Sequence, residues 1–149
     1  ARLLAPQNGT MGYGLPAAIA AKAAHPDRTV VCFAGDGDLQ MTIQELGTAR
    51  QAGYEPIVLV FDNGMYGTIR AHQERNYPGR ISGTPIDNPD FVAIAQAYGM
   101  HAEAVRETDA FGPAFERAMA SPTGALLHLH MPAEMLTPWE SIDQARDRT

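Results

Sequence analysis

Two short motifs place oxygen-bearing side chains directly after two apolar segments. Gly-Asp-Gly at 35–37 follows the apolar run 29–34, and Asp-Asn-Gly at 62–64 follows the apolar run 57–61. Both runs are expected to be buried strands. Parallel strands of one βαβ unit end at the same edge of a sheet, where α/β proteins bind ligands. The Asp36 carboxylate and a carboxamide, that of Asn63, would therefore meet there, and such oxygens suit a hard cation such as Mg²⁺ shared with phosphates.

The rest of the chain alternates between helical and strand patterns. Helices are expected over 13–24, 42–52, 64–72, 90–98 and 109–120, and further strands over 101–105 and 124–131. Residues 76–88 are rich in turn formers and predict a surface loop, and residues 132–149 predict an irregular tail. This alternation predicts an α/β fold, a doubly wound parallel sheet with helices on both faces.

Local signals refine three of these elements. Thr42 and Glu45 have the spacing of a capping box at a helix start. Gly53 fits the glycine that follows a helix end. Cys32 lies inside an expected strand, where a buried, inert thiol is the ordinary outcome.

Composition sets the broad class of protein. Apolar residues make up 45% and charged residues 19% of 149 residues, which fits one globular domain over 1–149. The formal charge of −6 argues against general nucleic-acid binding, and no apolar run approaches the ~20 residues of a membrane span. A single cysteine favours a reducing cytoplasm. Because the chain starts at Ala1 without a leader-like pattern, it is expected to be a fragment of a longer polypeptide.

A glycine-rich segment precedes the two motifs, from Asn8 to Pro16, and the order of all three resembles the thiamine diphosphate-dependent enzymes. That family carries Gly-Asp-Gly followed at a fixed interval by Asn-Asn, and residues 38–61 provide that interval here. The stretch 9–21 is similar to the family's Gly-Thr-Met-Gly-Tyr-Gly-Leu-Pro-Ala-Ala-Ile segment. Gln-Glu-Leu at 44–46 and Thr-Pro at 137–138 resemble the acetolactate synthase-like branch.

The resemblance implies a role for each matched position. Mg²⁺ would be held by the side chains of Asp36 and Asn63 and by the backbone carbonyl of Met65, with diphosphate oxygens and a water completing the shell. Gly37, Asp38, Tyr66 and Gly67 would bring backbone amides to the diphosphate, since helix starts are anion sites. The Gly9 carbonyl and the Met11 amide would hold the aminopyrimidine, and the Met11 side chain would bend the cofactor. The implied cofactor-binding residues are Gly9, Thr10, Met11, Gly35, Asp36, Gly37, Asp38, Asn63, Met65, Tyr66 and Gly67.

The chain departs from the family pattern at three points. Asp62 replaces the first Asn of Asn-Asn, which is not the metal ligand. Asp38 replaces a small residue beside the diphosphate, so its carboxylate is expected to face away. The activating glutamate of the family lies in an N-terminal pyrimidine-binding domain of a second subunit, so no catalytic residue is expected in this chain, which would be half of an active site.

The histidines allow two readings each. His128 and His130 share one face of an expected strand and could form a metal pair, but with no third ligand in sight, ordinary histidines are favoured. His72 stands where acetolactate synthases resemble one another in carrying a tryptophan at the acceptor pocket, so it is either a substrate-pocket residue or a helix-surface residue. Trp139 is expected to pack within the tail.

The resemblance implies the diphosphate- and Mg²⁺-binding half of an enzyme that decarboxylates a 2-oxo acid and joins the product to an acceptor, as acetolactate synthases do. A 2-oxo acid decarboxylase, an oxalyl-CoA-type decarboxylase, a non-catalytic α/β cofactor-binding module and a scaffold-only family member remain alternatives. The full-length protein would be a homodimer or homotetramer, and it could carry FAD outside this chain. Neither nucleic acid nor a membrane is an expected partner.

Overall fold

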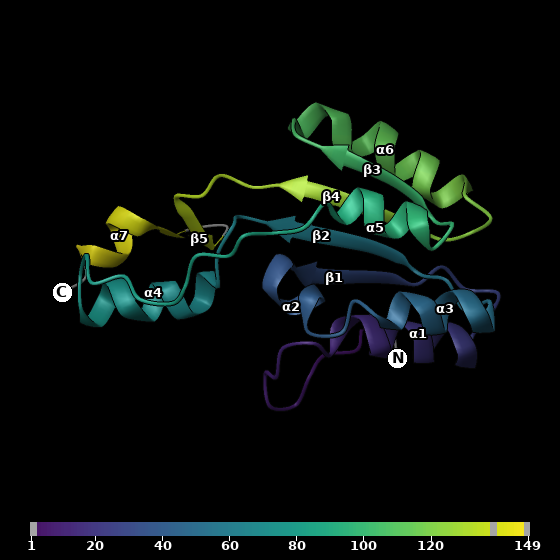
Figure 1. The fold of residues 1–149 in the computed structure, drawn as a ribbon, viewed down its shortest axis with the longest axis horizontal. Coiled ribbons are helices and arrows are strands. Elements are labelled where there is room, and N and C mark those ends of the chain that lie inside the picture. The colour runs from purple at the N-terminus through teal and green to yellow at the C-terminus, as the bar shows by residue number, and fades with distance from the viewer. Residues whose placement is uncertain (1–2, 138–139, 148–149) are drawn as a thin grey trace.

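A four-stranded parallel sheet forms the centre of the computed structural model, which describes residues 3–137 and 140–147. The strand order is β1 (Val31–Gly35), β2 (Ile57–Asp62), β4 (Ala125–His130), β3 (His101–Val105). β2 and β4 are adjacent although the chain between them is long, and their carboxyl ends point to the same edge (Figure 1). The expected parallel α/β sheet is confirmed.

Helices cover the two faces of the sheet unequally. One face packs against α1 (Gly14–Ala24), α2 (Asp36–Gln40), α3 (Glu45–Ala52) and α5 (Phe91–Ala97). The other face packs against α6 (Thr108–Ala120), which lies over β3 and β4. Over β1, Phe33 is therefore 68% exposed and stacks on Phe61 with ring centroids 5.9 Å apart.

The apolar strand residues explain why the sheet forms where it does. Val58 and Val60 point into the core under α1, α3 and α5, whereas Ile57 and Leu59 alternate to the α6 side. A parallel strand that is covered on both faces needs apolar residues at consecutive positions. The apolar run 57–61 is uninterrupted because β2 is covered by helices on both faces of the sheet.

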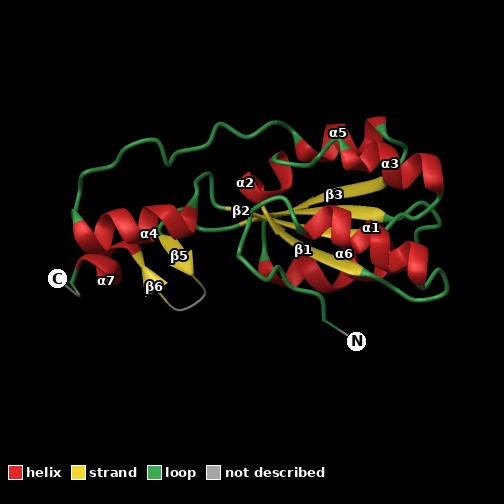
Figure 2. Cartoon of the chain, turned by 90° about the horizontal axis from the view of Figure 1, so that it is seen from below, coloured by secondary structure: helices red, strands yellow, loops and turns green. Residues whose placement is uncertain are grey.

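A smaller unit lies beyond the carboxyl ends of the strands, at the left of Figures 1 and 2. It consists of α4 (Gly67–Asn76), β5 (Met135–Thr137), β6 (Glu140–Ser141) and α7 (Ile142–Arg146), and Ala71, Leu136 and Ala145 form its core. The prediction of an irregular tail is therefore wrong for these elements: the tail packs on Ala71 of α4, and its Arg146 donates to the buried Glu74 of the same helix.

Three local expectations fare differently. Gly53 ends α3 with φ 69°, as expected. The capping box at 42–45 is wrong, because the Thr42 hydroxyl donates to the Gly12 carbonyl and the Glu45 carboxylate accepts from Thr48 instead. A capping box does form at α7, between Ser141 and Gln144. Helix α4 also continues past His72 to Asn76, and the long loop 77–90 follows it.

Two further observations concern the start of α2 and the tail. The Gly-Asp-Gly motif continues directly into α2, which begins at Asp36. Pro138 and Trp139 lie outside the described residues. Among the helices that are described, none is long and apolar enough to cross a membrane.

Candidate functional site

The two motifs meet at the carboxyl edge of the sheet, as the sequence predicts. Asp36 follows β1 and is only 3% exposed, and its Oδ2 accepts a hydrogen bond of 3.1 Å from the Gly64 amide of the second motif. Its Oδ1 accepts from the Gly37 amide at 2.9 Å. One carboxylate therefore joins the turns that end two neighbouring strands.

A second carboxylate, that of Asp62, lies beside Asp36. The Asn88 side-chain amide donates to Asp36 Oδ2 at 2.7 Å and to Asp62 Oδ1 at 2.8 Å. The Gly64 amide also donates to Asp62 Oδ1, at 2.8 Å. Sequence reasoning missed Asn88, because it comes from the loop before α5 and no motif spacing links it to the two strands.

Burial separates the pKa values of these two carboxyl groups. Loss of hydration raises the pKa of Asp36, and the neighbouring Asp62 adds to this, although hydrogen bonds from Asn88 and Gly37 oppose it. Burial acts to raise the pKa of Asp62 as well, but hydrogen bonding to His128 and Asp36 outweighs it and lowers that pKa. Two carboxylates this close repel each other unless a proton or a cation lies with them.

The donor set fits a hard cation. A carboxylate offers about four acceptor positions, and the hydrogen bonds to Asp36 fill three of them, which leaves capacity on Oδ1. The Asn63 carboxamide oxygen accepts a single long bond of 3.3 Å from the Met65 amide. All these donors are oxygens, which Mg²⁺ prefers.

The peptide around Met65 is fixed by pairing with the 77–90 loop. Tyr66 donates to the Thr84 carbonyl at 2.9 Å, and Ile86 donates to the Gly64 carbonyl at 2.8 Å, so Met65 and Pro85 form an antiparallel bridge. The loop therefore holds in place the segment whose carbonyl is the expected third metal ligand.

The glycine-rich segment is tied to α2 by Asp38. The Asp38 Oδ1 accepts from the buried Gly12 amide at 2.5 Å, and the Gly12 carbonyl accepts from Thr42 at 3.0 Å. This contact directs the Asp38 carboxylate toward the start of α1. Gly9 has a left-handed φ of 67°, and Asn8 Oδ1 accepts hydrogen bonds from the backbone amide and the hydroxyl of Thr10. Met11 is half-buried.

Two of the amides expected to meet a diphosphate already have protein partners. The Gly37 amide donates to Asp36, and the Tyr66 amide donates to Thr84. A Cβ at Gly37 would lie 2.5 Å from the Tyr66 ring and 2.9 Å from Ile86, so only glycine fits under that ring. The cofactor-binding roles of Gly9, Thr10, Met11, Gly35, Gly37, Asp38, Tyr66 and Gly67 stay predictions.

The histidine pair lies closer to a third candidate ligand than the sequence suggested. His128 Nε2 is 2.7 Å from Asp62 Oδ2, and ligand atoms of Asp62, His128 and His130 all lie within 4.8 Å of one another. The His128 ring packs edge-on against Phe91, with centroids 5.2 Å apart. Through Asp62, His128 supports the second motif. Burial lowers the pKa of His130 and keeps its imidazole neutral.

His72 and Cys32 are placed as surface and core residues. His72 lies on the exposed side of α4, away from Ala71 and Glu74, so its role in a substrate pocket stays a prediction. Cys32 is buried, as expected, and burial together with the Asp38 charge raises the pKa of its thiol to about 12. That thiol stays protonated.

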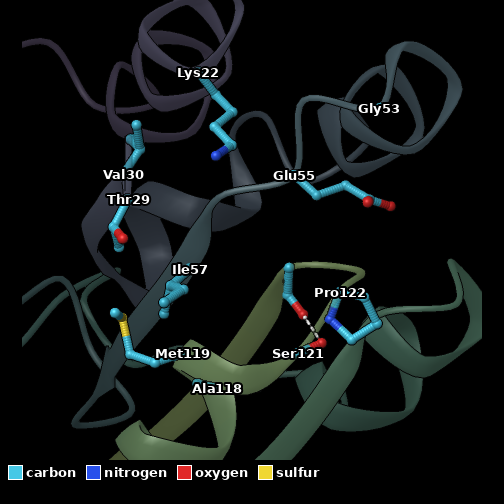
Figure 3. A pocket seen from close by; sticks show the side chains of 11 residues that line it. Lys22, Thr29, Val30, Gly53, Glu55, Ile57, Ala118, Met119, Ser121 and Pro122 are labelled. Carbon is cyan, nitrogen blue, oxygen red and sulfur yellow. Dashed lines mark hydrogen bonds between the residues drawn. The ribbon is translucent and has the colours of Figure 1, made fainter. Parts of the chain in front are cut away.

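Two hollows lie away from Asp36, among the residues that the structure describes. A hollow of about 160 Å³ lies at the amino ends of the strands (Figure 3), where the Ser121 hydroxyl donates to the Gly124 carbonyl at 2.8 Å. Its lysine, Lys22, already donates to the carbonyls of Pro26 and Arg28. A larger groove of about 870 Å³ runs over the exposed Phe33 and Phe61 and is mainly apolar.

Comparisons with known proteins show the family to which the chain belongs. The sequence pattern of the family described as "Thiamine pyrophosphate enzyme, C-terminal TPP binding domain" matches residues 2–129. Acetolactate synthase isozyme 2 large subunit of Escherichia coli (strain K12) is 39% identical over 122 residues, 81% of this chain and 22% of that protein. Acetolactate synthase of Arthrospira platensis is 41% identical over 114 residues, 75% of this chain and 20% of that protein.

A solved structure shares the fold. The thiamine diphosphate-dependent 4-hydroxybenzoylformate decarboxylase of Rhodococcus jostii RHA1 aligns with a TM-score of 0.79 and 33% identity, covering 85% of this chain and 24% of that one. The chain therefore spans about a fifth of the length of the curated relatives and a quarter of this structural relative.

Proposed function

Since the chain belongs to the thiamine pyrophosphate enzyme family, as its C-terminal TPP-binding domain, we propose that it binds the diphosphate and Mg²⁺ in an enzyme that acts on 2-oxo acids. The proposed activity is acetolactate synthase-like decarboxylation and carboligation. The observation that carries the proposal is the buried Asp36 carboxylate, which spans the two motif turns and lies beside a second carboxylate. A divalent cation would balance that pair of negative charges.

Each residue of the site has a defined task in this proposal. Asp36 and Asn63 would supply side-chain oxygens to Mg²⁺, and Met65 would supply its carbonyl. Asp38 would hold the glycine-rich segment at Gly12, so that the Gly9 carbonyl and the Met11 amide face the pyrimidine. When bound, thiamine diphosphate supplies the electron sink for loss of carbon dioxide from a 2-oxo acid.

The remaining parts of the site are proposed to come from outside this chain. A second subunit would contribute the N-terminal pyrimidine-binding domain and its activating glutamate, which makes the enzyme a homodimer or homotetramer. FAD, if the full-length protein uses it, would bind outside these residues. The isolated chain is therefore expected to show no turnover with pyruvate and weak cofactor binding; carbon dioxide release by the purified chain at enzymatic rates would contradict the half-site proposal.

A decarboxylase that releases an aldehyde is the second candidate, favoured by the similarity to the Rhodococcus jostii decarboxylase. We put carboligation first because the identity to the acetolactate synthases, 39% and 41%, is higher than the 33% to this decarboxylase. The test is product analysis with the full-length protein, Mg²⁺, thiamine diphosphate and pyruvate. Acetolactate as the main product supports the first candidate, and acetaldehyde supports the second. Consumption of neither pyruvate nor an aromatic 2-oxo acid would favour a non-catalytic binding module.

A further inference from the structure

The loop 77–90 returns to the carboxyl edge of the sheet after leaving the smaller unit (Figures 1 and 2). It pairs with the second motif through Thr84 and Ile86, as described above. It then ends at α5, where the Asp90 carboxylate accepts from the Ala93 amide at 2.9 Å and Phe91 is fully buried. The last loop residues are therefore anchored to the sheet core, and their side chains have fixed positions relative to the strands.

Asn88 uses this fixed position to contact both carboxylates at once. Its single amide nitrogen donates to Asp36 at 2.7 Å and to Asp62 at 2.8 Å, which uses both of its N–H groups. Its carbonyl oxygen accepts from the Gln40 amide at 2.7 Å. The Gln40 contact fixes the orientation of the Asn88 amide. If that amide were flipped, its NH₂ group would face the NH₂ group of Gln40, and its oxygen would face the two carboxylates.

The Asp36 and Asp62 carboxylates are bridged by two neutral donors, the Asn88 side-chain amide and the Gly64 backbone amide. Removing the side-chain donor leaves only the backbone bridge to oppose their mutual repulsion, which then displaces the Asp36 carboxylate. With the bridge in place, Asp36 Oδ2 accepts hydrogen bonds from Gly64 and Asn88, and Oδ1 accepts one from Gly37. The acceptor position that remains for a cation is then on Oδ1, and its direction is fixed. Groups that orient a metal-ligating carboxylate typically change metal affinity by ~10- to 100-fold.

We propose that Asn88 is the positioning residue of the cation site: it sets the direction of the Asp36 carboxylate and links the site to the 77–90 loop, with Gln40 orienting its amide. This inference rests on the proposed Mg²⁺ and thiamine diphosphate site. Asn88 touches neither cofactor nor substrate in this role, and it acts through Asp36 and Asp62.

The test compares full-length variants stripped of metal and cofactor. Mg²⁺ is titrated by calorimetry at saturating thiamine diphosphate, and thermal unfolding is measured without metal. Asn88→Ala is expected to weaken Mg²⁺ binding about tenfold, and turnover is expected to recover at high Mg²⁺. Asn88→Asp keeps the side-chain volume but replaces the donor with an acceptor, so it should weaken Mg²⁺ binding at least as much. Asn76→Ala is the matched control, because Asn76 is exposed and donates only to the His72 carbonyl in the described contacts.

The outcomes separate the two proposals. If the wild-type protein binds Mg²⁺ and Asn88→Ala binds it with the same affinity, the positioning role alone is overturned. Tighter Mg²⁺ binding by Asn88→Asp would have the same consequence. Failure of the wild-type protein to retain Mg²⁺ and thiamine diphosphate would overturn the proposed function and this inference with it. If Asn88→Ala does not fold, Gln40→Ala serves instead, with an expected loss of about threefold in Mg²⁺ affinity, because it only loosens the amide; unchanged binding there would also contradict the proposal.

Discussion

Two buried carboxylates in this molecule are equally hidden from water but have opposite electrostatic surroundings. Glu74, in the smaller unit, is 1% exposed and accepts from Arg70 at 2.7 Å and from Arg146 at 2.8 and 3.1 Å. Asp36, at the sheet edge, is 3% exposed and accepts from two backbone amides and one side-chain amide, all neutral. The pKa of Glu74 falls to about 2, chiefly through Arg146, whereas burial raises the pKa of Asp36.

This difference distinguishes a structural ion pair from the proposed site of an exchangeable cation. The two arginines belong to the chain and keep their charge, so Glu74 always has counter-charges at hand, and its ion pairs join α4 to α7. At the sheet edge, the basic partner that the structure gives to the Asp36–Asp62 pair, within its described residues, is the imidazole of His128. A cation that binds there relieves repulsion that the protein itself leaves in place.

The largest expected effect is on the cation site. Asp36→Ala and Asn63→Ala in the full-length protein should each weaken Mg²⁺-dependent retention of thiamine diphosphate by at least about a hundredfold, because each removes an inner oxygen ligand. Calorimetry on metal-stripped protein measures the effect. The comparison requires the folded state to persist, so circular dichroism should stay unchanged; full cofactor retention in either variant would remove that residue from the ligand set.

Removing charge from the arginine-paired carboxylate should act on stability instead. Glu74→Gln leaves Arg70 and Arg146 without their counter-charge and should lower the free energy of unfolding by about 3 kcal/mol, measured by urea titration. Glu116→Gln is the matched control, because Glu116 is exposed on α6. An equal effect of both substitutions would show that the Glu74 ion pairs contribute nothing specific.

The pH dependence of that stability difference follows from the pKa of Glu74, which is about 2 in the folded chain against an ordinary value of 4.5. A lowered carboxyl pKa contributes stability above pH 4.5, and this contribution is lost as pH falls toward 2. The difference in unfolding free energy between wild type and Glu74→Gln should therefore shrink steadily from pH 5 to pH 2. A difference that stays constant over this range would contradict the assignment.

A smaller effect, on product yield, is expected from a substitution on the exposed side of α4. His72 lies opposite the Glu74 cluster on α4, and if it lines the acceptor pocket of the assembled enzyme, its polar ring should select small aliphatic keto acids poorly. His72→Trp should then raise the acetolactate yield from pyruvate about tenfold. Efficient acetolactate formation by the wild type, unchanged in His72→Ala, would place His72 on the surface only.

The smallest expected effect concerns Asp62. Asp62→Asn keeps an oxygen that accepts from Asn88 and Gly64, and its amide can donate to His128, so Mg²⁺ affinity should change less than about threefold. Calorimetry under the conditions used for Asp36→Ala gives the direct comparison. A loss as large as that of Asp36→Ala would identify Asp62 as a metal ligand.

Local sequence determined most of the sheet and the core of the site. The uninterrupted apolar runs specify buried parallel strands because both of their faces must be covered, and the polar residues that follow them necessarily meet at one edge. Asp36 and Gly64 are in contact for that reason. Gly53 could be assigned because a left-handed residue after a helix favours glycine.

Only the tertiary structure decided which side chains satisfy one another across long separations. Asn88 reaches Asp36 and Asp62, Thr42 serves Gly12 rather than its own helix, and the tail folds onto α4 through Leu136 and Ala145. These contacts join segments that no periodicity relates, and a buried polar group accepts whichever partner the packed core brings within reach. Sequence pattern therefore fixes the strands of the central sheet and most of the helices between them. The smaller unit, and the balance of buried charge between the Asp36 pair and Glu74, emerge only when the chain has folded.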